Sequence, residues 1–185
     1  MLYLISGPSR SGKTLLAKTI LKETQIPYLS LDWLMMGFND GIPEYGIHHL
    51  LMPDELASRM WAFLQGMIDN ILFEGHDYVI EGEAMLPELV NTLIKKYPGK
   101  VRAVFIGYSE VDVDDKMAII KKYSTGENDW LTKESDEYIR DHINNMQRHG
   151  RVIKEECVKS DLPYFDTSAD FTETIELAKD YLLKA

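Results

Sequence analysis

The feature that most constrains this chain is a glycine-rich motif close to its first residue. Residues 7–14 read G-P-S-R-S-G-K-T and match the pattern G-x-x-x-x-G-K-[ST] at every fixed position. The apolar run at residues 2–6 predicts a strand before the motif, and residues 12–23 have the periodicity of a helix. A strand, a tight turn and a helix are the context in which this motif surrounds phosphate groups.

Each fixed residue of the motif has a physical task in binding a nucleoside triphosphate. Gly7 and Gly12 allow backbone conformations and a close approach that a Cβ would block. Successive backbone N–H groups then hold the phosphates, and Lys13 reaches the β- and γ-phosphates. The hydroxyl of Thr14 is a ligand for Mg²⁺, so we expect ATP and Mg²⁺ here. The expected nucleotide-binding residues are Gly7, Pro8, Ser9, Arg10, Ser11, Gly12, Lys13, Thr14 and Leu15. The Arg10 side chain could contact phosphate or remain solvated.

The rest of the chain alternates short β-rich runs with stretches of helical periodicity. We expect further strands at residues 28–31, 78–81, 101–106 and 164–166. Helices are expected to begin near residues 53, 87, 113, 133 and 171, and a loop is expected at residues 36–52. This order predicts a three-layer α/β/α P-loop NTPase fold with a mostly parallel sheet of about five strands, in one domain over residues 1–185.

Composition and charge argue against several other classes of protein. The formal net charge of −10 disfavours binding to a nucleic acid duplex, whose phosphates an acidic surface repels. No apolar stretch approaches the ~20 residues that a membrane helix needs, so we expect no membrane segment. The run at residues 2–6 lacks the basic flank and cleavage site of a signal peptide. Cys157 is the single cysteine and cannot form an internal disulfide, which favours a cytoplasmic location.

Carboxylates follow two expected strands at the end where ligands of open α/β sheets bind. Asp32 follows the second strand and could accept the proton of an acceptor hydroxyl and help to order Mg²⁺. Alternatively, Asp32 could cap the segment after it. Glu81 ends the third strand and could hold Mg²⁺ through water, unless Glu83 does so or both are simply solvated. The expected metal residues are therefore Thr14, Asp32 and Glu81.

The helix expected over residues 133–159 carries cationic side chains beside its apolar stripe. Arg140, Arg148 and Arg151 share one polar face at helical spacing. Such a face can be solvated and paired with nearby acidic residues, or it can reach phosphate. A polar, glycine-containing segment at residues 124–130 precedes this helix.

These motifs together resemble the small P-loop kinases, a group that includes nucleoside, shikimate and gluconate kinases, chloramphenicol phosphotransferase and zeta-toxin-like kinases. The resemblance covers the whole chain, while the N-K-x-D motif of GTPases and the D-G-x-P-R signature of adenylate-kinase-type enzymes are absent. It implies an ATP- and Mg²⁺-dependent transfer of the γ-phosphate to a small molecule. The catalytic residues that it implies are Lys13, Asp32, Arg148 and Arg151, with a lid around residues 124–151 that closes over phosphate.

The acceptor is expected against residues 35–52 and the helix after them. Aromatic and imidazole side chains offer walls and hydrogen-bond donors there; they are Trp33, Phe38, Tyr45, His48, His49 and Trp61. Two other functions stay open at this point. One is a nucleotide-binding regulatory switch with slow ATP hydrolysis, and the other is a toxin-like kinase of a nucleotide sugar.

Overall fold

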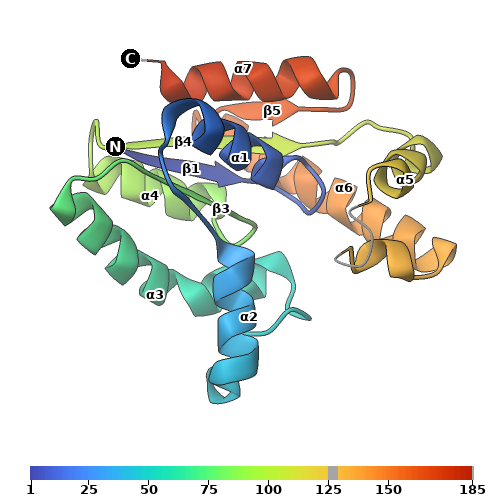
Figure 1. Ribbon diagram of the computed structural model, residues 1–185, viewed down its shortest axis with the longest axis horizontal. Coiled ribbons are helices and arrows are strands. Elements are labelled where there is room, and N and C mark those ends of the chain that lie inside the picture. Colours follow the sequence, from blue (N-terminus) through green and yellow to red (C-terminus); the bar gives the residue numbers. More distant parts are fainter. Residues whose placement is uncertain (125–128, 185) are drawn as a thin grey trace.

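A parallel sheet with the strand order β2-β3-β1-β4-β5 forms the centre of the protein (Figure 1). The computed structural model describes residues 1–124 and 129–184, and the five strands of this sheet lie within them. The strands are β1 (Leu2–Ser6), β2 (Tyr28–Ser30), β3 (Tyr78–Gly82), β4 (Val101–Gly107) and β5 (Tyr164–Asp166). All neighbouring strands pair in parallel, which confirms the predicted sheet.

Helices cover both faces of this sheet and give the predicted three layers. Figure 1 shows α1 and α7 on one face, and α3 and α4 on the other. The α-helices are α1 (Lys13–Thr24), α2 (Leu31–Gly41), α3 (Pro53–Glu74), α4 (Pro87–Lys96), α5 (Val113–Lys122), α6 (Asp136–Lys159) and α7 (Phe171–Leu183). Two short 3₁₀ turns, η1 (Pro43–Tyr45) and η3 (Leu131–Lys133), lie between them. No helix in the described part of the chain is long and apolar enough to cross a membrane.

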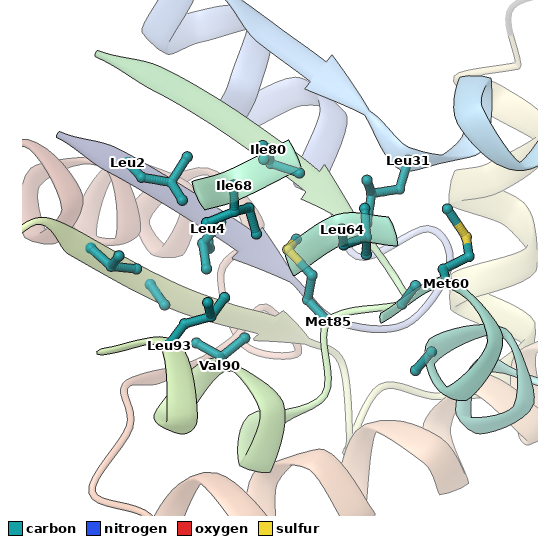
Figure 2. Packing of buried hydrophobic residues seen from close by; sticks show 14 of the residues in the cluster. Leu2, Leu4, Leu31, Met60, Leu64, Ile68, Ile80, Met85, Val90 and Leu93 are labelled. Carbon is teal, nitrogen blue, oxygen red and sulfur yellow. The ribbon is translucent and has the colours of Figure 1, made fainter. Parts of the chain in front are cut away.

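Alternate side chains of β1 enter two separate cores, so this strand is apolar on both faces. Leu2 and Leu4 pack with the buried stripes of α3 and α4, as Figure 2 shows. Tyr3 and Ile5 pack on the opposite face with α1 and α7. A third cluster joins α5 and α6 beyond the sheet and includes Tyr108. The central strand is thereby fixed from both sides, and the turn at its end starts from a rigid point.

The prediction of a loop at residues 36–52 is wrong for its first part. Helix α2 continues to Gly41, and η1 follows it. Phe38 packs edge-on against Phe63 of α3 at 5.2 Å and lies 6.0 Å from Tyr45. These aromatic contacts stabilise a helix that two glycines would otherwise disfavour.

The segment expected to act as a lid, residues 124–151, is only partly described. Residues 125–128 lie outside the described residues. Helix α6 begins at Asp136 rather than near residue 133, because the Ser135 hydroxyl accepts a hydrogen bond from the N–H of Tyr138 and caps it. The lid itself stays a prediction.

Candidate active site

The turn between β1 and α1 has a backbone shape that only its glycines permit. Gly7 has φ +137°, and a Cβ on it would lie 1.9 Å from the carbonyl oxygen of Ile106. Gly12 has φ +105° and immediately precedes α1, where no side chain caps the helix. The free N–H groups at the start of α1 therefore face the turn, as an anion site requires. The Ser11 hydroxyl is buried without a hydrogen-bond partner among the described residues, which suits a cradle built for a polar ligand.

Lys13 is the buried cation of this cradle. Its side chain is 7% exposed, and its Nζ donates a hydrogen bond of 2.8 Å to the carbonyl oxygen of Pro8. The same Nζ lies 3.7 Å from a carboxylate oxygen of Glu83, just after β3. The ammonium group is therefore held at the turn, and its contact with phosphate stays a prediction. Leu15, also expected at the nucleotide, is half exposed on α1.

Thr14 and Glu81 are brought together as the sequence predicts. The Thr14 hydroxyl donates a hydrogen bond of 3.0 Å to Glu81 Oε1, and Glu81 is 1% exposed. The parallel register of β1 and β3 places Ile5 beside Glu81, so both strands end at the same edge. A hydroxyl and a carboxylate oxygen are ligands that Mg²⁺ prefers. The described residues contain no group of three or more His, Cys, Asp or Glu that could hold a metal.

Asp32 and Glu83 extend the negative charge around Lys13. Burial raises the pKa of the Glu83 carboxyl; Lys13 opposes this effect, and Asp32 and Glu81 add to it. Asp32 therefore lies within electrostatic reach of Glu83. It is exposed in the first turn of α2, whose N-cap is Ser30, so the alternative that Asp32 caps this helix is wrong.

Arg10 is paired with a buried carboxylate, and its contact with phosphate stays a prediction. It has a left-handed φ of 61°, and its guanidinium forms two hydrogen bonds of 2.9 and 2.5 Å with the carboxylate of Asp129. The Asp129 side chain is only 1% exposed. A bidentate pair of this kind is strong and fixes geometry, so it ties the P-loop to the segment before α6.

Two buried residues that the sequence analysis missed support the P-loop from β4 and α5. The Tyr108 hydroxyl donates a hydrogen bond of 2.9 Å to the carbonyl oxygen of Ser9, and Lys116 Nζ donates one of 3.0 Å to the carbonyl oxygen of Arg10. Lys116 Nζ also lies 3.9 Å from the centre of the Tyr108 ring. Burial, with the charge of Arg10, lowers the pKa of Lys116 to about 8. A single lysine on an amphipathic helix gives no signal in the sequence for this role.

The structure does not bring the expected arginines of α6 to the P-loop. Arg148 donates a hydrogen bond to the side chain of Asn145, and Arg151 donates one of 2.9 Å to the carbonyl oxygen of Ser109. Arg140 pairs with Asp114. Neither Arg148 nor Arg151 has a hydrogen bond or ion pair with residues 7–14. The two line an open polar hollow of about 450 Å³ with Asp141, Asn144, Asn145 and Gln147. Their role at phosphate stays a prediction.

The expected acceptor side lies around α2, η1 and α3. His48 and His49 line a hollow of about 310 Å³ with Asn39, Pro43, Ile47 and Leu50. Trp33 is 58% exposed and lies 5.6 Å from the ring of Tyr28. Trp61 instead packs against the core of α3 and α4, so it forms a second buried face of its helix.

The loop between β5 and α7 is tied to the end of β4 by the carboxylate of Asp166. Asp166 accepts hydrogen bonds from the hydroxyls of Ser109 and Ser168 and from Lys154. Burial opposes ionisation of Asp166, but these hydrogen bonds outweigh it and lower the pKa of the carboxyl. The loop is therefore anchored beside the P-loop edge of the sheet.

Known structures share this fold along nearly the whole chain. A gluconokinase from Sinorhizobium meliloti 1021 is 18% identical with a TM-score of 0.56, covering 97% of this chain and 90% of its own. A shikimate kinase from Bacteroides thetaiotaomicron is 16% identical with a TM-score of 0.56, and the match covers 97% of this chain and 94% of the shikimate kinase. A sugar kinase from Janibacter sp. HTCC2649 is 17% identical with a TM-score of 0.56, covering 98% and 93%.

The chain has the fold of the small P-loop kinases. No protein-family model matches it, and no curated protein is significantly similar to it in sequence. The likeness at these identities establishes the fold, and the chemistry must be argued from the site itself.

Proposed function

We propose that the protein is an ATP- and Mg²⁺-dependent phosphotransferase that moves the γ-phosphate to a small-molecule acceptor. The observation that carries this proposal is the hydrogen bond of 3.0 Å between Thr14 and Glu81 in the same cradle as buried Lys13. A hydroxyl, a carboxylate and an ammonium group in this arrangement suit Mg²⁺ and a triphosphate. The gluconokinase, shikimate kinase and sugar kinase folds support a small-molecule acceptor.

The residues of the chain divide the work of this reaction among them. The N–H groups of the turn and Lys13 bind and orient the phosphates, while Thr14 and Glu81 hold the metal. Bound Mg²⁺ neutralises charge that develops on the phosphate oxygens. Asp32, exposed and within electrostatic reach of Glu83, accepts the proton of the acceptor hydroxyl as the new bond to phosphorus forms and the bond between the γ-phosphorus and ADP breaks.

The experiment is a screen of acceptors with MgATP as the phosphate donor. Sugars, sugar acids, nucleosides and hydroxyl-bearing antibiotics are first ranked by thermal shift with MgADP present, because a bound acceptor stabilises the folded protein. ADP formation is then measured with each hit, and a Lys13→Ala variant serves as the control. We expect one acceptor class to accelerate ADP formation well above hydrolysis by water. Slow hydrolysis that no acceptor accelerates would instead indicate a regulatory switch.

A further inference from the structure

Helix α6 packs directly against the P-loop at Gly150. A Cβ added to Gly150 would lie 3.5 Å from Cγ of Pro8 and 3.5 Å from the hydroxyl of Tyr164. Only a space of about one methyl group therefore separates α6 from Pro8 of the cradle at this point. The residue next to this contact, His149, is half-buried and is not part of the arginine face.

The charges that act on the His149 imidazole come from the P-loop and from the start of α3. Burial lowers the pKa of this imidazole; the negative charge of Asp54 opposes the effect, and the positive charge of Lys13 adds to it. Asp54 is in the first turn of α3, so the ring is within electrostatic reach of both the P-loop and the expected acceptor side. The imidazole is therefore neutral at pH 7 and can both donate and accept a hydrogen bond.

The Nε2 atom of this ring is buried and has no hydrogen-bond partner among residues 1–124 and 129–184. Two other buried or partly buried polar side chains of α6 have partners: Gln147 donates a hydrogen bond of 2.6 Å to the carbonyl oxygen of Val111, and Lys154 donates one to Asp166. A buried polar atom without a partner costs free energy, and such atoms are uncommon unless a ligand or water satisfies them. A ligand that enters the cradle beside Lys13 would meet this need.

We infer that His149 is a further substrate-contacting residue of the proposed reaction, whose Nε2–H donates a hydrogen bond to an oxygen of the transferring phosphoryl group. The inference rests on the proposed function, because Lys13 is the group that binds this phosphoryl group there. The required tautomer carries its proton on Nε2. A neutral donor of this kind adds a directed hydrogen bond to those of the backbone N–H groups of the turn.

His142 provides a matched control on the same face of α6, two turns before His149. Its Nε2 is also buried without a partner among the described residues, and burial with the charge of Arg10 lowers its pKa. Its ring packs edge-on against Trp130 at 5.3 Å. Lys13 is not among the charges that act on it, so His142 is about as buried as His149 but lacks the electrostatic influence of the P-loop lysine.

The test compares the wild type with three variants: His149→Leu, His149→Gln and His142→Leu. Two probes are titrated by calorimetry, MgADP alone and MgADP with aluminium fluoride, which imitates the transferring phosphoryl group. We expect His149→Leu to weaken binding of the fluoride complex about 10-fold or more, as one lost hydrogen bond to a charged group predicts. Its affinity for MgADP alone and its melting temperature stay close to wild type. His149→Gln keeps an N–H at similar reach and recovers part of the loss, while His142→Leu changes neither affinity.

Three results would overturn the inference, and they differ in what they say about His149 and about the proposed function. Wild-type affinity of His149→Leu for the fluoride complex overturns the inference and leaves the proposed function intact. Equal losses with both probes, together with a lower melting temperature, assign His149 a purely structural role and also overturn it. If the wild type binds no MgADP, the proposed function fails, and the inference fails with it.

Discussion

Lys116 gives the sharpest prediction about stability, because its charge is buried against the P-loop. The residue is 6% exposed, and its ammonium group contacts the carbonyl oxygen of Arg10 and the face of Tyr108. The Arg10 charge also repels it. Replacement by methionine keeps the aliphatic length, removes the charge and allows a sulfur contact with the ring.

The magnitude follows from the pKa of Lys116, which falls from 10.5 to about 8 in the folded protein. Each pKa unit corresponds to about 1.4 kcal/mol, so keeping this lysine charged destabilises the fold by about 3 kcal/mol at pH 7. The lost hydrogen bond to Arg10 offsets about 1 kcal/mol of the gain. We therefore expect Lys116→Met to raise the free energy of unfolding by about 2 kcal/mol, or the melting temperature by about 4–8 °C.

The direction in which stability changes with pH can be used to test this prediction. Because the folded pKa is lower than the unfolded one, the unfolded chain binds more protons between pH 8 and 10.5. The wild type is thus stabilised as the pH rises through this window, and the advantage of Lys116→Met shrinks towards zero at pH 10. Thermal unfolding at pH 7 and pH 10 measures both values. Lys122→Met, at an exposed lysine 5.1 Å from the Tyr123 ring on the same helix, is the control and should change stability little.

Two results would refute this reasoning. One is a Lys116→Met protein that is less stable than the wild type at pH 7, because burial of the charge would then cost nothing. The other is a gain in stability that is equal at pH 7 and pH 10. MgADP affinity is expected to fall in the variant even as stability rises, since the carbonyl of Arg10 loses its donor.

Three further predictions concern the proposed reaction itself. Lys13→Ala should abolish turnover, because Lys13 is the cation of the phosphate motif; wild-type activity would contradict the P-loop assignment. Glu81→Gln should raise the Mg²⁺ concentration needed for half-maximal activity, and excess EDTA should stop the wild type; an unchanged Mg²⁺ titration would remove Glu81 from the metal site. Asp32→Asn should lower the rate about 10²-fold with little change in ATP affinity or melting temperature, and a rate within about threefold of wild type would exclude Asp32 as the base.

The sheet and the P-loop were predictable because local patterns fix them. The apolar run of β1, its glycine turn and the first turn of α1 are continuous in the sequence. The approach of Thr14 to Glu81 also follows from pattern, since parallel strands that end at one edge bring their last residues together. Asp32 could be placed at this edge on the same grounds, although its role is untested.

The supports of the P-loop could not be predicted from the sequence, because they depend on contacts between distant segments. Arg10 and Asp129 are separated by 119 positions, and many other carboxylates of this acidic chain were equal candidates for the pair. Lys116 lies on an ordinary amphipathic helix, and only the packing of α5 against Tyr108 shows that its charge is buried. The helical course of α2 likewise depends on the contact between Phe38 and Phe63, which outweighs local glycine propensity.

These supports explain how the cradle can be rigid although its own residues are small and flexible. In a trans peptide, the carbonyl of one residue and the N–H of the next point in opposite directions. Tyr108 donates a hydrogen bond to the carbonyl oxygen of Ser9, so the N–H of Arg10 points away from Tyr108. Lys116 donates to the carbonyl oxygen of Arg10, so the N–H of Ser11 points away from Lys116. Donors fixed before the ligand arrives need no ordering when it binds, which strengthens binding. We therefore expect phosphate affinity to depend on Tyr108 and Lys116, two residues that lie outside the glycine-rich motif.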